Sequence, residues 1–399
     1  MVAMKILVVC QFYYPENFVI TRIAEKLVEY GHDVTVLTGK PNYGYGHILP
    51  GYENIDSEII NGVKVERVNL KPRQYTRKSI IDNYLSFWKN SKKWVRRCKE
   101  KYDVVYSMSL SPVTILSAGN LYKKKFGVPH VVHCVDLWPE SVLVTNAVKK
   151  KSLMYKILYR WSKKLYSKAD EILIGSPSFE EYFKNELNIT NIELKYVPQP
   201  SMVEDSNLEP FPFDKKYFNI LYCGNLGIIQ HVPFMVEAMN QLKGTDIRFN
   251  VIGMGPMSEY LQNKIKEYHL QENIVYFGPM PANKASAYFK GADALYVSLK
   301  KDGYVGKTIP NKLVMSMAFG KPIIAMLEGD GKNILVESDG AVFSDQSYIS
   351  LASAIKTAYG LSKRELNRLG QNNLEYYKKN LTIDIVTHQI EAELLNKCK

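Results

Sequence analysis

Long hydrophobic runs are missing from this 399-residue sequence. No stretch of about 18 uncharged apolar residues occurs, so the sequence predicts no transmembrane helix. The apolar start, residues 5–10, is not followed by the small-residue cleavage site of a signal peptide and predicts a first core strand. We therefore expect a protein of the cytoplasm.

Cysteine is scarce and scattered. The five cysteines form no Cys-x-x-Cys pair and no cluster with histidine, which argues against a zinc site and a disulfide framework. We expect all of them to be free thiols in a reducing compartment: Cys10, Cys98, Cys134, Cys223 and Cys398.

The common phosphate-binding motifs are also missing. Neither Gly-x-Gly-x-x-Gly nor a Walker lysine occurs, so an NAD-binding fingerprint and a P-loop are excluded. What is present is ordinary for a globular protein, with 46% apolar and 23% charged residues. The length is that of two domains rather than one.

The net charge of +12 is concentrated in two segments of the N-terminal half. Residues 71–101 carry a net charge of +9 and residues 149–168 a net charge of +8, which leaves −5 for the rest of the chain. Both segments predict amphipathic helices that contain tryptophan, which suits an anionic membrane surface. A core-facing apolar stripe with a solvated basic face is the simpler alternative. No nucleic-acid-binding module accompanies the charge, so we expect no nucleic-acid partner.

Short β-branched runs alternate with helical patterns along the chain, which predicts parallel βαβ units. The pattern runs to a proline-rich segment, residues 197–216, and then restarts at a strand over 218–224. We predict an α/β protein of two doubly wound domains, residues 1–200 and 201–380, and a final helix, 381–399, that packs back on the first domain. In such folds ligands bind at the carboxyl ends of the strands, so we expect a cleft between the domains.

In the second domain, four glycine- or proline-containing loops follow predicted strands. Glycine lets backbone N–H groups approach a ligand, and helix N-termini favour phosphate. Any one of these loops is also accounted for by turn geometry alone, but four at one sheet edge predict an anion site. The candidate ligand-binding residues are Gly224, Asn225, Gly227, Gln230, Gly253, Gly255, Pro256, Gly278, Met280, Lys300, Thr308, Ile309 and Pro310.

Lys312 lies in the first turn of a predicted helix, where a cation is unfavourable unless an anion is bound. The sequence contains no Asp-x-Asp, the pattern that commonly holds a metal against the diphosphate of a sugar nucleotide. Helix dipoles and lysines would have to neutralise such a diphosphate instead, so we expect no metal ion and no cofactor.

In the first domain, polar and aromatic residues follow the predicted strands. Asp136 and Glu140 are candidates to orient or deprotonate a hydroxyl group, although helix capping would also account for them. Trp138 is equally consistent with a core position. The candidate acceptor-binding residues are Glu16, Asn17, Asn42, Tyr43, Ser109 and Trp138.

Six stretches occur in the order typical of one family: TGKPNYGYGHILPGY, DLWPES, YCGNLGIIQ, ADALYVSLK, TIPNKLVMSMAFGKPIIA and EGDG, within residues 38–331. They resemble the family 4 glycosyltransferases of GT-B fold. The resemblance is strongest to the bacterial branch with N-acetyl-L-fucosamine transferases of surface-polysaccharide synthesis, such as capsule or O-antigen.

The resemblance implies a nucleotide-sugar donor, such as a UDP-sugar, in the second domain and a lipid-linked saccharide acceptor in the first. It implies transfer with retention of configuration and without metal, at the inner face of the membrane. Thr308, Ile309 and Pro310 would lie at the phosphates and Lys312 beside them. The basic segments 71–101 and 149–168 would dock the protein on the membrane.

The sequence departs from many members of this family in two segments of the second domain, and in the first of them Asn225 and Gln230 replace the usual Arg and Lys. Lys307 and Met315 stand where those members have glutamates that contact sugar and ribose. Asp330, next to Gly331, is our candidate to hold the ribose instead. Two alternatives stay open: a nucleotide-sugar 2-epimerase of the same fold, and a partner protein that kept the fold without catalysis.

Overall fold

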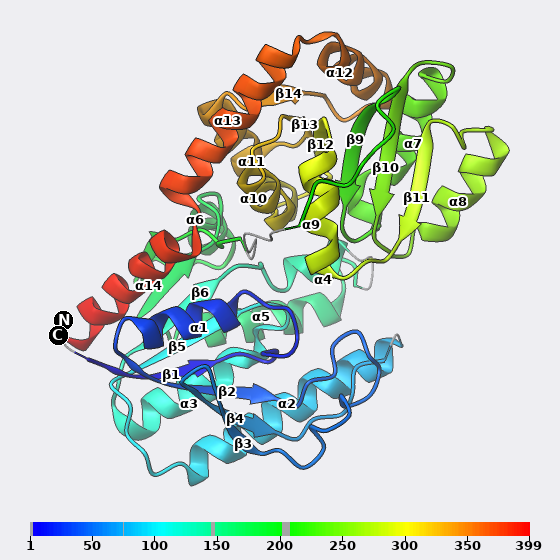
Figure 1. Cartoon of the computed structure of the whole chain (residues 1–399). Coiled ribbons are helices and arrows are strands. Elements are labelled where there is room, and N and C mark those ends of the chain that lie inside the picture. Colours follow the sequence, from blue (N-terminus) through cyan, green and yellow to red (C-terminus); the bar gives the residue numbers. More distant parts are fainter. Residues whose placement is uncertain (1–2, 75, 145–147, 202–207) are drawn as a thin grey trace. The chain divides into compact units, whose positions relative to one another are not determined.

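The computed structural model describes residues 3–74, 76–144, 148–201 and 208–399. It divides the chain into two compact units (Figure 1). Unit 1 comprises Met1–Met202 with Ile383–Lys399, and unit 2 comprises Val203–Thr382. None of the described helices combines the length and the apolar character that crossing a bilayer needs.

Unit 1 is built on a sheet of order β3-β4-β2-β1-β5-β6-β7-β8. The strands are β1 (Lys5–Val9), β2 (Asp33–Gly39), β3 (Ser57–Ile60), β4 (Val63–Val68), β5 (Val104–Ser109), β6 (His130–Cys134), β7 (Glu171–Ile174) and β8 (Glu193–Tyr196). All neighbours are parallel except β3, which pairs antiparallel with β4 at the edge. The central strands β1, β5 and β6 are mainly apolar and, apart from Lys5, buried, as strands covered on both faces require.

The helices of unit 1 connect these strands. They are α1 (Ile20–Glu29), α2 (Arg77–Arg97), α3 (Leu116–Phe126), α4 (Glu140–Val144), α5 (Leu153–Tyr166) and α6 (Phe179–Glu181), with short helical turns η1 (Val113–Ile115) and η2 (Tyr182–Glu186). Thr76 caps α2 and Ser152 caps α5 through their side-chain oxygens.

The C-terminal helix α14 (Ile383–Cys398) belongs to unit 1. It lies beside α1, and its Val386, Ile390 and Leu394 join the apolar core of unit 1 (Figure 1). Polar contacts support the docking, because His32 Nε2 lies 2.8 Å from Glu391 Oε1 and Lys26 pairs with Asp384 at 2.9 Å.

Unit 2 contains a fully parallel sheet of order β11-β10-β9-β12-β13-β14. Its strands are β9 (Phe218–Cys223), β10 (Ile247–Ile252), β11 (Ile274–Gly278), β12 (Ala294–Ser298), β13 (Ile323–Met326) and β14 (Ala341–Phe343). Its helices are α7 (Val232–Gln241), α8 (Ser258–Glu267), α9 (Ala282–Gly291), α10 (Asn311–Ala318), α11 (Gly329–Ser338), α12 (Tyr348–Gly360) and α13 (Lys363–Asn380), with turns η3 (Ile228–Gln230) and η4 (Val305–Lys307).

The predicted α/β class with two doubly wound units is confirmed. Sequence analysis omitted the short strands β3, β4, β8 and β14 and the helix α11, which begins inside the EGDG stretch. Part of the predicted linker, residues 202–207, lies outside the described residues. The part that follows packs on unit 2, where the rings of Phe211 and Tyr288 stack at 4.0 Å. All five cysteines are free, as expected.

Candidate functional site

The carboxyl edge of the unit 2 sheet gathers most of the predicted donor-binding residues. Strand β9 lies between β10 and β12, so the chain leaves β9 and β12 toward helices on opposite faces. This is the switch point at which doubly wound sheets bind ligands. The loops that follow β9 and β12 carry Gly224–Gln230 and Lys300–Pro310, and Lys312 lies in the first turn of α10.

Two glycines let the loops after β9 and β10 touch. Gly224 and Gly253 have φ angles of 141° and 133°, and a Cβ on Gly253 would lie only 1.9 Å from the Gly224 carbonyl oxygen. A Cβ on Gly224 would lie 2.4 Å from Lys312 Cε. Both positions therefore need glycine for close packing, and this packing brings the first two loops against the Lys312 side chain.

Lys312 is held entirely by neutral groups. Its Nζ donates to the hydroxyl of Tyr222 and to the carbonyl oxygen of Asn225, the latter at 3.1 Å, and lies over the Tyr222 ring. Within the described residues no carboxylate pairs with it. Burial lowers the pKa of Lys312 to about 8, so the side chain is still mainly charged at neutral pH.

The 305–310 loop meets the start of α11. Gly329 packs so closely on this loop that its Cβ would lie 2.6 Å from Lys307 Cα. A Cβ on Gly331 would lie 3.3 Å from Pro310 Cδ and 3.4 Å from the Thr308 carbonyl oxygen. The structure thus brings Asp330, Gly331, Thr308 and Pro310 together, with the N-termini of α10 and α11 beside them.

The remaining predicted donor residues differ in their surroundings. Lys300 is half exposed and pairs with Asp302 at 2.5 Å, so its charge is already compensated. Met280 and Ile309 pack against the apolar core of unit 2. Gln230 Oε1 is buried without a hydrogen-bond partner in the described part of the chain, which leaves it available to a ligand.

Gly227, Gly255, Pro256 and Gly278 complete this edge. A Cβ on Gly227 would lie 2.4 Å from Gln230 Oε1, and one on Gly255 would lie 2.5 Å from Asn225 Oδ1. Gly278 accepts through its carbonyl from the Gly253 N–H, whereas Pro256 is exposed. The loops that follow β9, β10 and β11 are therefore joined into one surface.

Sequence analysis missed the residues that hold this edge in place. The apolar pattern places Tyr222 in a strand and gives it no further role, although its hydroxyl accepts from Lys312 and donates to Asn225. His231, at φ 49°, contacts Gln346, which also accepts from the Lys301 N–H. A tyrosine at the end of a strand that precedes a glycine loop was the one sequence signal for this arrangement.

At the carboxyl edge of unit 1, Asp136 follows β6. Its Oδ2 accepts from the Ser111 hydroxyl at 2.8 Å, and Ser111 Oγ lies 2.8 Å from Ser141 Oγ. Burial raises the pKa of Asp136, and the serine hydroxyls oppose that shift. A carboxylate with a raised pKa is suited to accept a proton from a hydroxyl group.

Glu140 has a different environment from Asp136. It starts α4 and is 5% exposed, and the hydroxyl of Tyr155 in α5 donates to its Oε1. Trp138 and Ser109 are also buried, at 6% and 0% exposed. Glu140, Trp138 and Ser109 are therefore buried side chains rather than groups presented to solvent.

Glu16 and Asn42 are buried and hold the loops after β1 and β2. Glu16 Oε1 accepts from the backbone N–H groups of Asn42 and Tyr43 at 2.6 and 2.5 Å. Tyr43 is 43% exposed, and Asn17 is exposed as well. Among the predicted acceptor residues, Tyr43 and Asn17 are thus the ones that present side chains to solvent.

In the described ranges, no group of three or more His, Cys, Asp or Glu side chains is arranged to hold a metal ion.

Two family models match the chain. The one described as Glycosyl transferase 4-like domain matches residues 17–200, and the one described as Glycosyl transferases group 1 matches residues 217–360. The first match falls in unit 1 and the second in unit 2.

Two bacterial proteins are similar in sequence. "Probable glycosyltransferase WbjE" of Pseudomonas aeruginosa is 27% identical over 236 residues, which cover 57% of this chain and 58% of that protein. The match therefore spans somewhat more than half the length of that relative. "Amylovoran biosynthesis glycosyltransferase AmsD" of Erwinia amylovora is 21% identical over 308 residues, 74% of this chain and 82% of that protein.

Solved structures share the fold. Sucrose-phosphate synthase from Thermosynechococcus elongatus has a TM-score of 0.76 at 16% identity and covers 98% of both chains. HepE of Anabaena, solved in complex with UDP, has a TM-score of 0.70 at 15% identity and covers 98% of this chain and 100% of its own. The chain therefore belongs to the glycosyltransferases of GT-B fold, with a glycosyl transferase 4-like domain in unit 1 and a group 1 domain in unit 2.

Proposed function

We propose that the protein transfers a sugar from a UDP-sugar to a short saccharide linked to undecaprenyl diphosphate during surface-polysaccharide synthesis. Unit 2 binds the donor and unit 1 binds the acceptor. The observation that carries the proposal is Lys312, a charged, half-buried side chain held only by neutral groups at the sheet edge. A diphosphate supplies the negative charge that this cation lacks.

The donor diphosphate is assigned to the surface between Gly227 and the 305–310 loop. Negative charge develops on the β-phosphate as the bond to the sugar breaks. The backbone N–H groups at the starts of α10 and α11, where the helix dipoles are positive, stabilise that charge. Asp330 of α11 is assigned to the ribose hydroxyls. A structure of similar fold that was solved with UDP, HepE of Anabaena, supports uridine as the nucleoside of the donor.

The acceptor hydroxyl is assigned to Asp136. As the hydroxyl oxygen forms the new glycosidic bond, its proton passes to the Asp136 carboxylate. The bond between the sugar and the β-phosphate breaks, and UDP leaves with the electron pair. Retention of configuration, independence of metal and an N-acetylated amino or deoxy sugar are the expectations that the family resemblance adds.

A membrane location follows from the two basic segments, because they adjoin in the structure. Trp88 of α2 and Trp161 of α5 meet edge to face with ring centroids 5.8 Å apart. Residues three or four apart lie on the same side of a helix. Exposed apolar side chains therefore lie on the same side of each helix as its tryptophan, one or two turns before it. They are Ile81, Leu85, Leu153, Met154 and Ile157, from 43% to 75% exposed.

We name these five residues, with the lysines and arginines of 71–101 and 149–168, the basic face. Exposed apolar residues among lysines fit the interface of an anionic bilayer better than they fit water. We propose that this face holds the protein on the inner surface of the cytoplasmic membrane, where a lipid-linked acceptor is found. Binding to vesicles with anionic lipid should fall at least tenfold in a Leu153→Glu, Ile157→Glu double variant.

The experiment that tests the function is a nucleotide panel followed by product analysis. Calorimetry without added metal should show tighter binding of UDP than of GDP or ADP. Incubation with UDP-sugars and a lipid-diphosphate saccharide should then give an elongated lipid. An altered sugar formed from donor alone would instead support the 2-epimerase, and UDP binding without any turnover would support a non-catalytic partner.

A further inference from the structure

Arg73 lies between two aromatic rings at the carboxyl edge of unit 1. Its guanidinium carbon is 5.0 Å from the centroid of the Tyr43 ring and 5.5 Å from that of Tyr84. Arg73 Nη1 donates to the Tyr84 hydroxyl at 3.1 Å. As far as the structure describes the chain, no carboxylate pairs with this arginine, although a guanidinium carries five N–H donors.

A buried polar network fixes the backbone beneath this arginine. The Arg73 N–H donates to Asn42 Oδ1 at 2.9 Å, and Asn83 Nδ2 donates to the same oxygen at 3.0 Å. Asn42 and Asn83 are fully buried, and the Asn42 N–H is bound in turn by Glu16. Side chains on such a framework are positioned before any ligand arrives, which is how binding sites are built.

Tyr84 links Arg73 to two other features of unit 1. Burial raises the pKa of Tyr84, Arg73 lowers it, and Asp136 raises it further, so both charges act on one hydroxyl. Tyr84 also belongs to α2, next to Leu85 of the basic face. The arginine thus lies near both the proposed reacting carboxylate and the proposed membrane surface.

We propose that Arg73, with Tyr43 and Tyr84, binds the diphosphate of the prenyl-linked acceptor. This inference rests on the proposed function and names the part of the acceptor that unit 1 recognises. The guanidinium binds phosphate oxygens through its remaining N–H groups. The Tyr84 hydroxyl stays protonated and donates to another phosphate oxygen, and the prenyl chain leaves along Ile81 and Leu85.

Calorimetry with geranyl diphosphate as the probe tests the site, with saturating UDP present to fill the donor site. We expect Arg73→Gln to weaken geranyl diphosphate binding about tenfold or more, and Arg73→Lys to weaken it less. The matched control is Arg364→Gln, which removes the same charge from the exposed face of α13 in unit 2, away from every residue assigned to the acceptor or the membrane. Binding in that control should change less than twofold.

Inorganic pyrophosphate should bind at least tenfold more weakly than geranyl diphosphate. Equal affinity for the two probes would overturn the lipid assignment, and equal losses in Arg73→Gln and Arg364→Gln would overturn the role of Arg73. UDP affinity measured alone separates this inference from the proposed function. Absence of UDP binding with intact geranyl diphosphate binding would defeat the donor proposal and leave the Arg73 site standing.

Discussion

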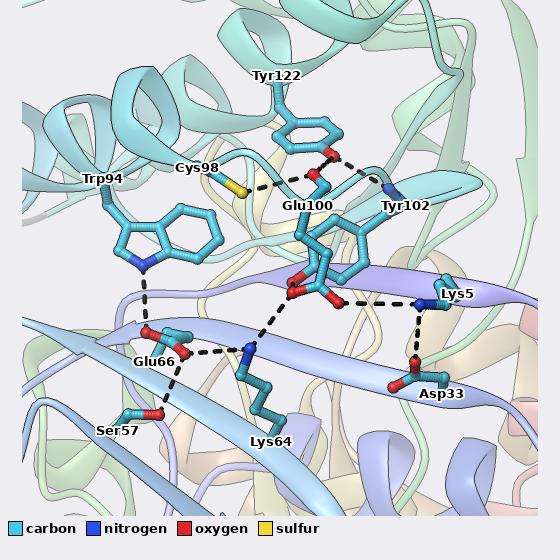
Figure 2. A network of polar contacts seen from close by, with 10 residues as sticks. All are labelled: Lys5, Asp33, Ser57, Lys64, Glu66, Trp94, Cys98, Glu100, Tyr102 and Tyr122. Atoms are coloured by element: carbon cyan, nitrogen blue, oxygen red, sulfur yellow. Dashed lines mark hydrogen bonds and ion pairs between the residues drawn. The ribbon is translucent and has the colours of Figure 1, made fainter.

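Cations at the amino edge of the unit 1 sheet and the cations Lys312 and Arg73 at the carboxyl edges differ in the groups that they contact. At the amino edge of unit 1, Lys64 lies 3.3 Å from Glu100 and 3.5 Å from Glu66, and Lys5 lies within 4 Å of Asp33 and Glu100 (Figure 2). At the carboxyl edges, Lys312 contacts the Tyr222 hydroxyl and a backbone oxygen, and Arg73 contacts the Tyr84 hydroxyl. The described residues offer neither cation a carboxylate.

Figure 2 shows the polar contacts of the amino-edge network. Trp94 and Ser57 donate to Glu66, and Tyr102 donates to the Glu100 carboxylate. Such a network is self-sufficient, since each carboxylate has its donors within the protein. Unlike Lys300, which has Asp302, the carboxyl-edge cations Lys312 and Arg73 are positioned as firmly but have no carboxylate partner among the described residues, which is costly unless a ligand supplies the anion. The comparison distinguishes the amino-edge charges, which stabilise the fold by pairing with one another, from the charges of Lys312 and Arg73, which we propose to bind a ligand.

The largest expected effect is on turnover, at the carboxyl edge of unit 1. Asp136→Asn keeps the hydrogen bond from Ser111 but removes the proton acceptor. The transfer rate should fall by about 10²–10⁴-fold, with UDP affinity unchanged. Rates of sugar transfer under saturating donor and acceptor measure this, and a loss smaller than fivefold would show that Asp136 does not take the proton.

A smaller effect is expected on donor binding. Lys312→Met should weaken UDP binding about 100-fold, because charge-assisted bonds to the diphosphate are lost. The same variant should unfold no more easily than the parent protein, because it removes an uncompensated charge. Calorimetry and thermal unfolding give both values.

Lys321→Met is the matched control. Lys321 is also half-buried, and burial lowers its pKa, but it lies before β13 at the amino edge of unit 2. UDP affinity should change less than twofold in this variant. Equal losses in the two variants would remove the distinction between the edges.

The smallest effect is expected at the amino edge. Burial raises the pKa of Glu100, but the contacts with Lys64 and Tyr102 outweigh this and hold it below its ordinary value. Ionised Glu100 therefore stabilises the fold at pH values above the ordinary pKa of glutamate, and this stabilisation is lost as the pH falls through the lowered pKa of Glu100. Glu100→Gln should cost about 0.5–1 kcal/mol of unfolding free energy at pH 7, less at pH 3, and leave UDP affinity unchanged.

Sequence patterns were sufficient for the fold and for part of the site. Apolar runs such as residues 5–10 and 218–224 are long enough to mark buried parallel strands, whereas β14 has three residues and β3 alternates at an exposed edge. The glycine loops and Lys312 could be predicted because several glycines after strands favour close backbone approach, and a cation at a helix start is unfavourable without an anion.

The other site residues depend on contacts between distant segments. Arg73 was only one basic residue among eleven in its segment until Asn42 and Asn83 were seen to fix its backbone. Tyr222 lay in an apolar strand with no sign that its hydroxyl meets Lys312, 90 residues later. Side chains whose roles rest on such pairings are not visible in a single sequence.

Proton uptake on UDP binding tests most directly the claim that Lys312 is reserved for the donor diphosphate. With its pKa lowered to about 8 by burial, Lys312 is half deprotonated at pH 8, and a bound diphosphate raises that pKa. Calorimetry at pH 8 in two buffers of different ionisation enthalpy should show uptake of about half a proton in the parent protein and none in Lys312→Met. UDP affinity in the parent should fall up to about tenfold per pH unit above pH 8. Binding without proton uptake, or equal uptake in both proteins, would contradict the account.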